Sequence, residues 1–539
     1  MTISEADLSA ATDAINLAAS VVDAGIRTLT KNGGPDANQV LAYDLAHAAA
    51  QVAAARALQD YGSRGTVEAR IACAFTAEMV HDLITRVAGR ESVWGVEIAP
   101  LRAAHPLLEK FRAPEFLASL AETPGPLHLD DEMTMVADTF RSFADKVIKP
   151  HAEHVHRANA DVPEEIVQGL AAMGAFGLSV PAEYGGFSEG GSNEYVAMVV
   201  ATEELSRGSL GIGGSLITRP EILTRALLKG GTEDQKAEWL PKLATAEVMP
   251  AVAVTEPDYG SDVANLKVTA SAAAGPDGAA GYVINGVKTW CTFGARADVL
   301  ALLARTDSDT SKTHRGLSLF IVPKPRGEGH AFSFSQPARG DGIVGTMEGR
   351  AIDTIGYRGM HSYEVSLVDW WVPATNLIGE TDGLGKGFAM QMAGFENGRL
   401  QTAARAVGVM QAAYEAAVDY ARNRKVFGAP IADYQLTQVK LGRMVMLIQA
   451  GRQFAYHVAR VMAESTDERG GTAEAAMVKA YVCKAAEWVT REAMQIHGGM
   501  GYAEEFPVSR YFVDARVLSI FEGADETLCL KVIARRLCG

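Results

Sequence analysis

The first 125 residues carry apolar positions at the spacing of helices. One stripe alternates steps of three and four, as a single helix face does: Leu8, Ala11, Ile15, Ala18 and Val22. Asn32-Gly33-Gly34-Pro35 is expected to end this helix, because glycine and proline do not continue it. Further helices are predicted over residues 36–61 and around residues 71–83. No chemistry shows in this block, so we interpret it as a packing or oligomerisation module that ends near Pro124-Gly125-Pro126.

The pattern then passes from helices to strands and back. Residues 126–248 remain helical, and short β-branched runs between turns over residues 249–373 are typical of an antiparallel β domain. Over residues 374–539 the apolar period returns to 3.6, as in a helical bundle, with one stripe at Leu436, Val439, Leu441 and Met444. The predicted fold class is α+β, mainly α. The predicted domains are an N-terminal helical extension (1–125), a helical domain (126–248), a middle β domain (249–373) and a C-terminal bundle (374–539).

The composition is that of an ordinary globular protein, with 48% hydrophobic and 21% charged residues and a net charge of -15. This acidic balance argues against a non-specific nucleic-acid surface. The five cysteines lack the paired spacing of a zinc site or a disulfide framework, so we expect a reducing compartment and no metal. The acidic N-terminus has no apolar signal core, and no apolar run reaches about eighteen residues, so we expect a cytoplasmic protein without a membrane span.

Two polar motifs occur in the expected β domain. Thr255-Glu256-Pro257-Asp258-Tyr259-Gly260-Ser261-Asp262 presents hydroxyls and N–H groups that suit a polar ring edge or a phosphate. An ordinary Pro-Gly turn is the alternative. Asn285-Gly286 predicts a tight hairpin that leads to Trp290 and Thr292. On an alternating strand these two residues share a face that suits a planar heterocycle, although a core tryptophan is the more common case.

A glycine trio and a candidate base lie near the C-terminus. In Gln495-Ile496-His497-Gly498-Gly499-Met500-Gly501-Tyr502 the glycines allow the backbone to approach a bulky anion. About twenty residues on, Glu522 follows the apolar pair Ile520-Phe521 and precedes Gly523. A carboxylate in apolar surroundings suits a general base, although a lone glutamate is more often a solvated surface group.

Over roughly residues 130–539 the chain resembles the acyl-CoA dehydrogenase family. The resemblance lies in the order of its motifs: TEPxxGSD, INGxKxWxT, GxR before a strand ending in VP, GKGF, GR, RKxFGxPI, QIHGGxGY and FEG. It implies an N-terminal helical domain, a central β domain and a C-terminal four-helix bundle, in agreement with the periodicity. It also implies bound FAD and removal of one α and one β hydrogen from an acyl-CoA thioester.

By position, the resemblance implies which residues contact FAD. Those near the flavin are Val254, Thr255, Gly260, Ser261, Trp290 and Thr292, with Trp290 against the ring and Thr292 reaching N5. Those that contact the FAD of a neighbouring subunit are Arg424, Phe427 and Gln435. Those of the pyrophosphate loop are Gln495, Gly498 and Gly499. Arginine brings a permanent cation to a pyrophosphate, and phenylalanine brings a flat face to adenine.

Glu522 matches the commonest position of the catalytic base in this family. Its carboxylate is implied to take the pro-R α-proton while hydride leaves Cβ for flavin N5. The backbone N–H at 522 and an FAD hydroxyl would then form an oxyanion hole for the thioester oxygen. The base position of some relatives, directly before the arginine of the GR motif, is Gly398 here. Ser261, Glu396 and Arg399 are implied to contact substrate.

The chain departs from the family pattern at two places. Glu522-Gly523 is usually followed by Thr-Ser but here by Ala524-Asp525, so one FAD hydroxyl contact is expected to be missing. The usual Ser/Thr-rich segment after Arg358 reads Gly359-Met360-His361-Ser362-Tyr363.

The extension, with Arg219-Pro220-Glu221 and residues 360–363, resembles members that oxidise (2S)-methylsuccinyl-CoA to mesaconyl-CoA in the ethylmalonyl-CoA pathway. The distal carboxylate of such a substrate needs a cation or several donors, because an unpaired buried charge is costly. The candidates are Arg219, Arg207 and His361, although each of these residue types is more often structural or at the surface.

Three functions stay open at this point. The first is a dehydrogenase of this or another short branched acyl-CoA that passes electrons to electron-transferring flavoprotein. The second is an acyl-CoA oxidase on the same fold, which uses O₂. The third is a non-catalytic flavin-binding protein with a protein or nucleic-acid partner, against which the intact Glu522 and the acidic charge argue. The family forms homodimers or dimers of dimers, and an extension that covers the tetramer surface would leave a dimer.

Overall fold

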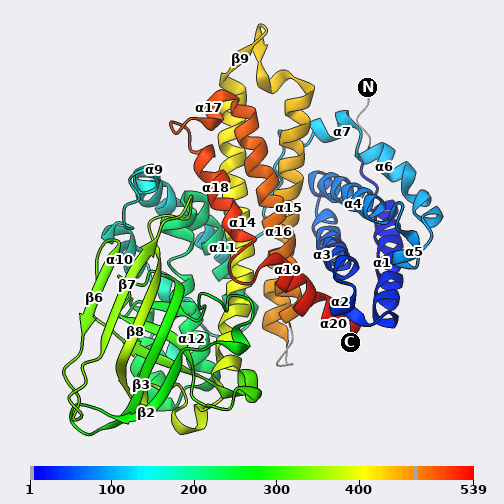
Figure 1. Ribbon diagram of the computed structural model, residues 1–539. Helices are drawn as coiled ribbons and strands as arrows, with labels where there is room; N and C mark the ends of the chain where they lie inside the picture. The colour runs from blue at the N-terminus through cyan, green and yellow to red at the C-terminus, as the bar shows by residue number, and fades with distance from the viewer. Residues whose placement is uncertain (1–4, 466–470) are drawn as a thin grey trace. The chain divides into compact units, whose positions relative to one another are not determined.

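The computed structural model describes residues 5–465 and 471–539, which form two compact units (Figure 1). The helical unit comprises Met1–Ser142, Gly191–Gly208 and Arg399–Gly539. The sheet unit comprises Phe143–Gly190 and Ser209–Gly398. The helical domain predicted over residues 126–248 therefore contributes segments to both units.

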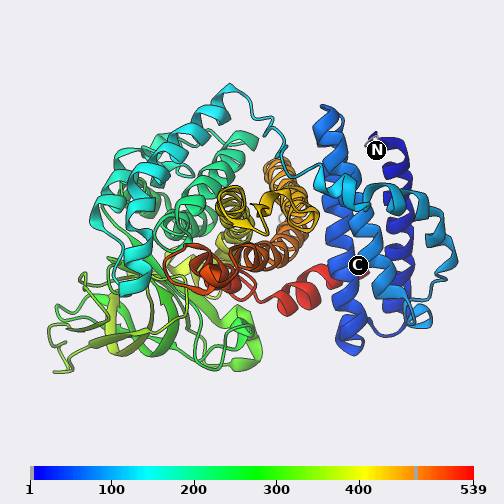
Figure 2. The same ribbon diagram turned by 90° about the horizontal axis from the view of Figure 1, so that it is seen from above.

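The N-terminal extension is a set of three long helices that pack side by side, seen in blue from above in Figure 2. They are α1 (Leu8–Lys31), α3 (Gln39–Gly62) and α4 (Thr66–Val87), and they confirm the helices predicted from the apolar stripes. The carboxylate of Asp7 caps α1 by accepting the N–H of Ala10 at 3.0 Å. Short helices complete the extension: α2 (Gly34–Ala37), α5 (Glu91–Trp94), α6 (His105–Phe111) and α7 (Pro114–Ala118).

The rest of the helical unit is a bundle of long helices. Its members are α8 (Asp131–Phe143), α11 (Ser192–Gly208), α14 (Gly387–Asn423) from Arg399 onward, α15 (Gln435–Glu464), α16 (Thr472–His497) and α18 (Val508–Leu518). Shorter segments follow or lie between them: β9 (Lys425–Val426), β10 (Ala429–Pro430), α17 (Gly499–Tyr502), α19 (Asp525–Thr527), the π-helical turn η11 (Leu528–Ile533) and α20 (Ala534–Cys538). A buried ion pair between Arg452 and Glu203, 2.6 Å apart, joins α15 to α11.

The extension and the bundle share a hydrophobic core. Ala46 of α3 packs with Ala476 and Ala480 of α16 and with Leu528 and Cys529 of η11. Small side chains on α3 and α16 allow the helices to approach closely, so the extension is packed into the bundle instead of standing apart from it.

One stripe predicted from the sequence is only partly buried. Leu441 and Met444 of α15 are buried, but Leu436 in its first turn is 70% exposed. This turn follows the short hairpin of β9 and β10, whose Phe427 is also exposed. The apolar stripe therefore extends past the packed part of the bundle.

The sheet unit contains one sheet of eight strands, drawn in green and yellow-green in Figure 1. The strands are β1 (Pro250–Ala253), β2 (Thr269–Ala274), β3 (Ala280–Thr292), β4 (Val299–Arg305), β5 (Leu317–Pro323), β6 (Ala331–Ser335), β7 (Thr346–Ile352) and β8 (Ser362–Pro373). Their order is β1-β4-β2-β3-β8-β7-β6, and β5 pairs with β4. Most neighbours are antiparallel as predicted, but β4 pairs in parallel with β1 and, at Thr269, with β2.

The hairpin predicted at Asn285-Gly286 is wrong. Strand β3 continues through both residues and pairs with β2 on one side and β8 on the other. The turn signal marks a bulge instead, where the register shifts between Ile284 and Gly286. Gly286 has a φ of +134°, and a Cβ there would lie 2.7 Å from Val268 Cγ2. The Oδ1 atom of Asn285 accepts the backbone N–H of Asp369 across the sheet.

Helices complete the sheet unit and bury its core. They are α9 (Lys149–Ala158), α10 (Glu164–Ala172), α12 (Thr218–Gly230) and α13 (Glu233–Ala244), with the first part of α14. Leu223 of α12 and Leu240 of α13 pack against Val252, Leu303 and Leu319 of the strands. Among the described residues, no helix is both long enough and apolar enough to cross a membrane. The predicted class, α+β and mainly α, is confirmed.

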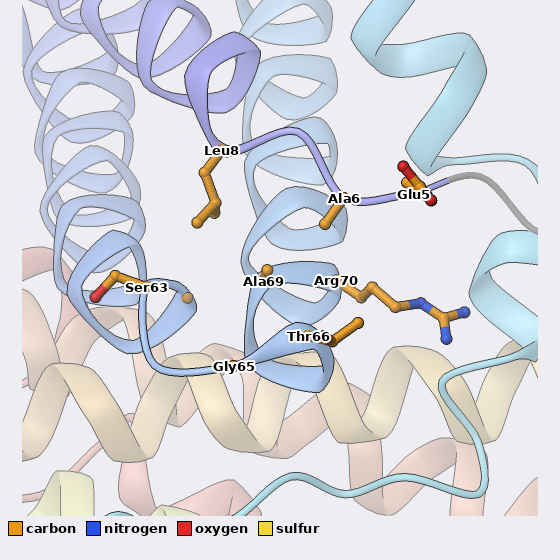
Figure 3. A pocket seen from close by; sticks show the side chains of 9 residues that line it. Glu5, Ala6, Leu8, Ser63, Gly65, Thr66, Ala69 and Arg70 are labelled. Carbon is orange, nitrogen blue, oxygen red and sulfur yellow. The ribbon is translucent and has the colours of Figure 1, made fainter.

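A pocket of about 580 Å³ lies within the extension, between the start of α1 and the turn from α3 to α4 (Figure 3). Its lining includes Leu8, Ser63, Thr66 and Arg70. The guanidinium group of Arg70 donates a hydrogen bond to Ser119 Oγ. None of the residues predicted to bind cofactor or substrate lines this pocket.

Candidate active site

Glu522 lies in the loop between α18 and α19 of the helical unit and is half-buried. The loop is closed by backbone hydrogen bonds, from the Phe521 N–H to Val517 O at 3.0 Å and from the Asp525 N–H to Ser519 O at 3.1 Å. Glu522 has a φ of +53° and Gly523 a φ of +96°. A left-handed conformation at a residue with a side chain costs on the order of 1–3 kcal/mol and persists only where its surroundings enforce it. The loop is therefore held in its shape by contacts.

Buried cations support the loop. Lys479 of α16 donates to the carbonyl oxygen of Gly523 at 2.6 Å. Burial lowers the pKa of Lys479, while the negative charges of nearby groups, Asp525 and Glu522 among them, act against this shift. The guanidinium of Arg405, also buried, lies 5.0 Å from the centre of the Phe521 ring. A negative charge on the loop is thus compensated from inside the bundle.

Asp525, the departure from the family pattern, faces inward and is 3% exposed. Its Oδ2 atom accepts a hydrogen bond from Tyr43 OH at 2.5 Å, and His47 Nε2 lies 3.1 Å away. The ammonium of Lys484 lies 3.5 Å from the same oxygen. Burial opposes ionisation of the carboxyl group, but the hydrogen bond from His47 and its charge lower the pKa of Asp525 to about 2. Sequence reasoning missed Tyr43 and His47 altogether.

In the sheet unit, a buried ion pair fixes the loop after β1. Glu256 accepts backbone N–H groups from Lys267 at 2.6 Å and Val268 at 2.9 Å. Lys288 Nζ donates at 2.9 Å both to Glu256 and to the carbonyl oxygen of Val254. Of the flavin-binding candidates on this loop, Val254 is buried, Thr255 is half-buried, and Gly260 and Ser261 are exposed. The pair of charges therefore positions a loop that presents its polar groups outward.

Trp290 and Thr292 do not follow regular strand alternation. Trp290 has a φ of +57° and is 53% exposed, at a point where the register between β3 and β8 shifts. Thr292 is buried, and its Oγ1 lies 2.9 Å from Ser362 Oγ. The argument from a shared strand face fails here because Trp290 lies within an irregularity of β3, between Lys288 and Cys291. The indole is nevertheless open to a ligand, and the threonine hydroxyl is oriented by a serine from the segment 360–363.

The pyrophosphate-loop candidates lie at the C-terminal end of α16. Gln495, Gly498 and Gly499 are exposed there, and a Cβ added at either glycine would meet no atom within 4 Å. Open backbone of this kind leaves room for a bulky anion, so these residues fit the diphosphate of FAD.

The neighbouring-subunit candidates lie on and beside the hairpin of β9 and β10. Phe427 at its tip is 99% exposed, and Arg424 is also exposed. Gln435 begins α15, and its Nε2 donates to Glu115 of the extension at 3.4 Å. An exposed aromatic ring beside an arginine suits an adenine and a phosphate.

The candidates for the substrate side are placed differently from one another. Arg207 is paired with Glu415 at 2.9 Å, and His361 lies 3.1 Å from Asp161, so both have anionic partners within the chain. Arg219 is buried, and its Nη2 donates to Tyr357 OH at 3.4 Å. Glu396 and Arg399 lie in α14, where Arg399 is buried and Glu396 is half-buried.

We expect the buried Lys288 to give stability an unusual dependence on pH. Burial lowers the pKa of Lys288 to about 8, against about 10.4 in an unfolded chain. Between these values the unfolded state binds more protons, so the contribution of Lys288 to stability rises with pH. The melting temperature of Lys288→Met should therefore decrease relative to that of the wild type as pH rises from about 8 to about 10. The control Lys267→Met, at an exposed lysine, should follow the wild type. Parallel curves for Lys288→Met and wild type would contradict this expectation.

Comparison with known proteins identifies the family. Residues 130–247, 251–369 and 385–538 match the N-terminal, middle and C-terminal domains of acyl-CoA dehydrogenase. The chain is 44% identical over 415 residues to (2S)-methylsuccinyl-CoA dehydrogenase of Cereibacter sphaeroides, covering 77% of this chain and 71% of that protein. Butyryl-CoA dehydrogenase from Megasphaera elsdenii superposes with a TM-score of 0.67 at 30% identity, over 76% of this chain and 99% of that one.

A second solved structure, a glutaryl-CoA dehydrogenase in complex with glutaryl-CoA, has a TM-score of 0.65 at 30% identity, over 76% of this chain and 95% of that one. The fold implied by the motifs is thereby confirmed. The cofactor implied by the motifs is likewise that of the family, whose members are FAD-dependent flavoproteins. On this evidence the chain belongs to the acyl-CoA dehydrogenase family of flavin-dependent oxidoreductases.

Proposed function

We propose that this enzyme oxidises (2S)-methylsuccinyl-CoA to mesaconyl-CoA, with Glu522 as the base that takes the α-proton. The observation that supports this substrate is the 44% identity to a protein named for it, maintained over 415 residues. Another short branched acyl-CoA is the alternative substrate.

In the proposed reaction, the Glu522 carboxylate accepts a proton from Cα of the thioester. Negative charge then develops on the thioester oxygen, and the backbone N–H of Glu522 donates a hydrogen bond to it. FAD, when bound, supplies the acceptor for the hydride that leaves Cβ. The closed loop and its buried cations serve this step, because proton transfer from carbon requires a carboxylate at a fixed position.

We propose contacts with FAD for each unit taken by itself. Val254, Thr255, Gly260, Ser261, Trp290 and Thr292 of the sheet unit are assigned to the flavin. Gln495, Gly498 and Gly499 of the helical unit are assigned to the pyrophosphate, and Arg424, Phe427 and Gln435 to the FAD of a neighbouring subunit. Support comes from the exposed indole of Trp290, the open backbone at the two glycines and the exposed ring of Phe427.

For the substrate, we propose contacts from Ser261, Glu396 and Arg399, and we assign Arg219 to the distal carboxylate. Among the three candidates we choose Arg219 for its burial and for the Tyr357 hydroxyl beside it. A buried arginine with a tyrosine hydroxyl beside it offers the charge and the donor that a desolvated carboxylate needs. Glutaryl-CoA, which one related structure holds, also ends in a carboxylate.

We further propose that electrons pass to electron-transferring flavoprotein and that the chain forms a homodimer or a dimer of dimers in the cytoplasm. Phe427, Leu436 and Tyr502 support self-association, because they are exposed large side chains of one unit. We also propose that the domain boundaries lie at residues 125, 248 and 373, as predicted from the sequence.

The substrate proposal is tested by adding a panel of acyl-CoA thioesters to the purified yellow protein without oxygen. (2S)-Methylsuccinyl-CoA should bleach the flavin fastest, ahead of succinyl-, glutaryl-, butyryl- and isovaleryl-CoA. Faster bleaching by another member would replace the substrate. Rapid reoxidation of the bleached protein by air in a stopped-flow experiment would identify an oxidase. Retained FAD that no acyl-CoA bleaches would indicate a non-catalytic protein.

The base assignment predicts the behaviour of Glu522→Gln. An amide cannot accept the α-proton, so this variant should keep FAD but reduce it about 10²–10⁴-fold more slowly. Stopped-flow absorbance with saturating substrate measures the rate. The matched control is Glu526→Gln, at an exposed glutamate four residues on, which should react at the wild-type rate. Normal bleaching by Glu522→Gln would place the base elsewhere.

The assignment of Arg424 predicts weaker cofactor binding when its cation is removed. A charge-assisted hydrogen bond contributes about 1.5–3 kcal/mol, so Arg424→Ala should raise the dissociation constant of FAD about 10–100-fold. Lys425→Ala, at the next exposed cation, is the control and should bind FAD as the wild type does. Fluorescence titration of the apoprotein with FAD measures both, and equal affinities would refute the contact.

A further inference from the structure

One buried carboxylate links the loop of the proposed base to the N-terminal extension. Three side chains from two helices meet at Asp525 Oδ2: Tyr43 OH at 2.5 Å and His47 Nε2 at 3.1 Å from α3, and the ion-paired Lys484 Nζ at 3.5 Å from α16. Tyr43 and His47 are one helical turn apart, and their rings pack edge to face with centres 4.7 Å apart. A carboxylate 3% exposed cannot leave such partners without a large desolvation cost, so Asp525 is fixed relative to α3.

Asp525 in turn fixes Glu522, three residues before it. The N–H of Asp525 closes the loop on Ser519 O, and the carbonyl of the intervening Gly523 is held by Lys479. Gly523 leaves the loop little freedom, since even a Cβ there would lie 2.8 Å from Leu528 Cδ2. A shift of Asp525 would therefore be transmitted to the carboxyl group at position 522.

Apolar packing beside the carboxylate prevents α3 from moving independently. Ala46, between Tyr43 and His47 on α3, shares a core with Leu528 and Cys529, which lie three and four residues after Asp525. Close-packed interiors transmit small displacements instead of absorbing them. The polar and apolar contacts thus hold the same two segments together.

We propose that Tyr43 and His47 are positioning residues for the catalytic base: through Asp525, the extension holds the loop that carries Glu522 at the geometry needed for proton abstraction. The inference rests on the proposed role of Glu522 as the base. Neither side chain is required to touch substrate. A displacement of about 1 Å at a reacting group is enough to slow a reaction up to about 10²-fold, so the constraint has a kinetic consequence.

A metal site is the competing interpretation of these side chains. The ligand-type atoms of His47, Asp525 and Cys529 lie within 4.8 Å of one another. However, the ammonium of Lys484 and the hydroxyl of Tyr43 already occupy the shared oxygen of Asp525. A cation 3.5 Å from that oxygen would repel a metal ion, so the arrangement favours hydrogen-bonded ion pairing.

The experiment uses the FAD-loaded protein and the acyl-CoA that bleaches the wild type fastest. Tyr43→Phe and His47→Gln should each slow flavin reduction at saturating substrate by about tenfold, with substrate dissociation constants within about twofold of wild type. Asp36→Asn is the matched control. Asp36 is also in the extension and pairs with Lys531 at 2.5 Å and Arg535 at 3.0 Å in the C-terminal segment, so its loss weakens the same junction away from Asp525. It should react within about twofold of wild type.

A kinetic isotope effect separates positioning from general loosening. With substrate deuterated at Cα, the isotope effect on flavin reduction should increase in Tyr43→Phe and His47→Gln, because a misplaced base makes Cα–H cleavage limit the rate more fully. The combination of His47→Gln with Asp525→Asn should be no slower than the slower single variant, because both act through one contact.

Several results would overturn the inference. They are wild-type rates in both Tyr43→Phe and His47→Gln, equal slowing by Asp36→Asn, an unchanged isotope effect, or stoichiometric zinc in the purified protein. Failure of the proposed function is recognised separately, by a wild-type protein that no acyl-CoA bleaches or by a Glu522→Gln variant that bleaches normally.

Discussion

Buried carboxylates, each held by polar or charged partners, keep the functional loops of this protein in place. An unpaired charge inside a protein costs several kcal/mol, so each partner confines the other. Asp525 is confined in this way by His47 and Lys484, and Glu256 by Lys288. The first pair lies beside the loop of Glu522, and the second lies under the loop of Gly260 and Ser261. Both loops lie outside the strands and long helices, so ladder and helix hydrogen bonds do not define their shape.

The long elements could be predicted from the sequence because their evidence is local. A stripe at steps of three and four predicts the buried face of α1 from five residues, and the short β-branched runs predict β1, β4 and β5. Asn285-Gly286 shows that a local turn preference does not always predict the structure. Its turn preference was overridden because β3 gains ladder hydrogen bonds on both sides by continuing, and a bulge accommodates the glycine. The stripe at Leu436 was misjudged for a related reason, since periodicity does not show where a helix leaves the core.

The candidate site divides in the same way. Glu522, Trp290 and the glycines of residues 498–501 stand in motifs that the sequence displays, so they could be found without the structure. Tyr43 and His47 could not, because their contacts with Asp525 span 482 and 478 residues of chain. The available signals were indirect: Ala524-Asp525 replaces a familiar pair, and a tyrosine and a histidine stand four apart on an otherwise alanine-rich helix. Neither signal predicts that these residues contact each other, because a single sequence does not show which distant positions meet.

The extension has the character of an integral part of the helical unit. The matched domains begin at residue 130, yet residues before that point accept hydrogen bonds from buried side chains of the bundle. Tyr414 OH donates to Ala121 O at 2.8 Å, and Gln449 donates to Pro124 O at 2.6 Å, so the connecting segment supplies acceptors to buried polar groups of α14 and α15. The apolar face of α3 covers small residues of α16. A chain that began at residue 130 would expose that face, leave these donors without their acceptors and remove Tyr43 and His47 from Asp525. Such losses fall on the elements that frame Glu522, which is why a block without chemistry of its own bears on the chemistry of the whole.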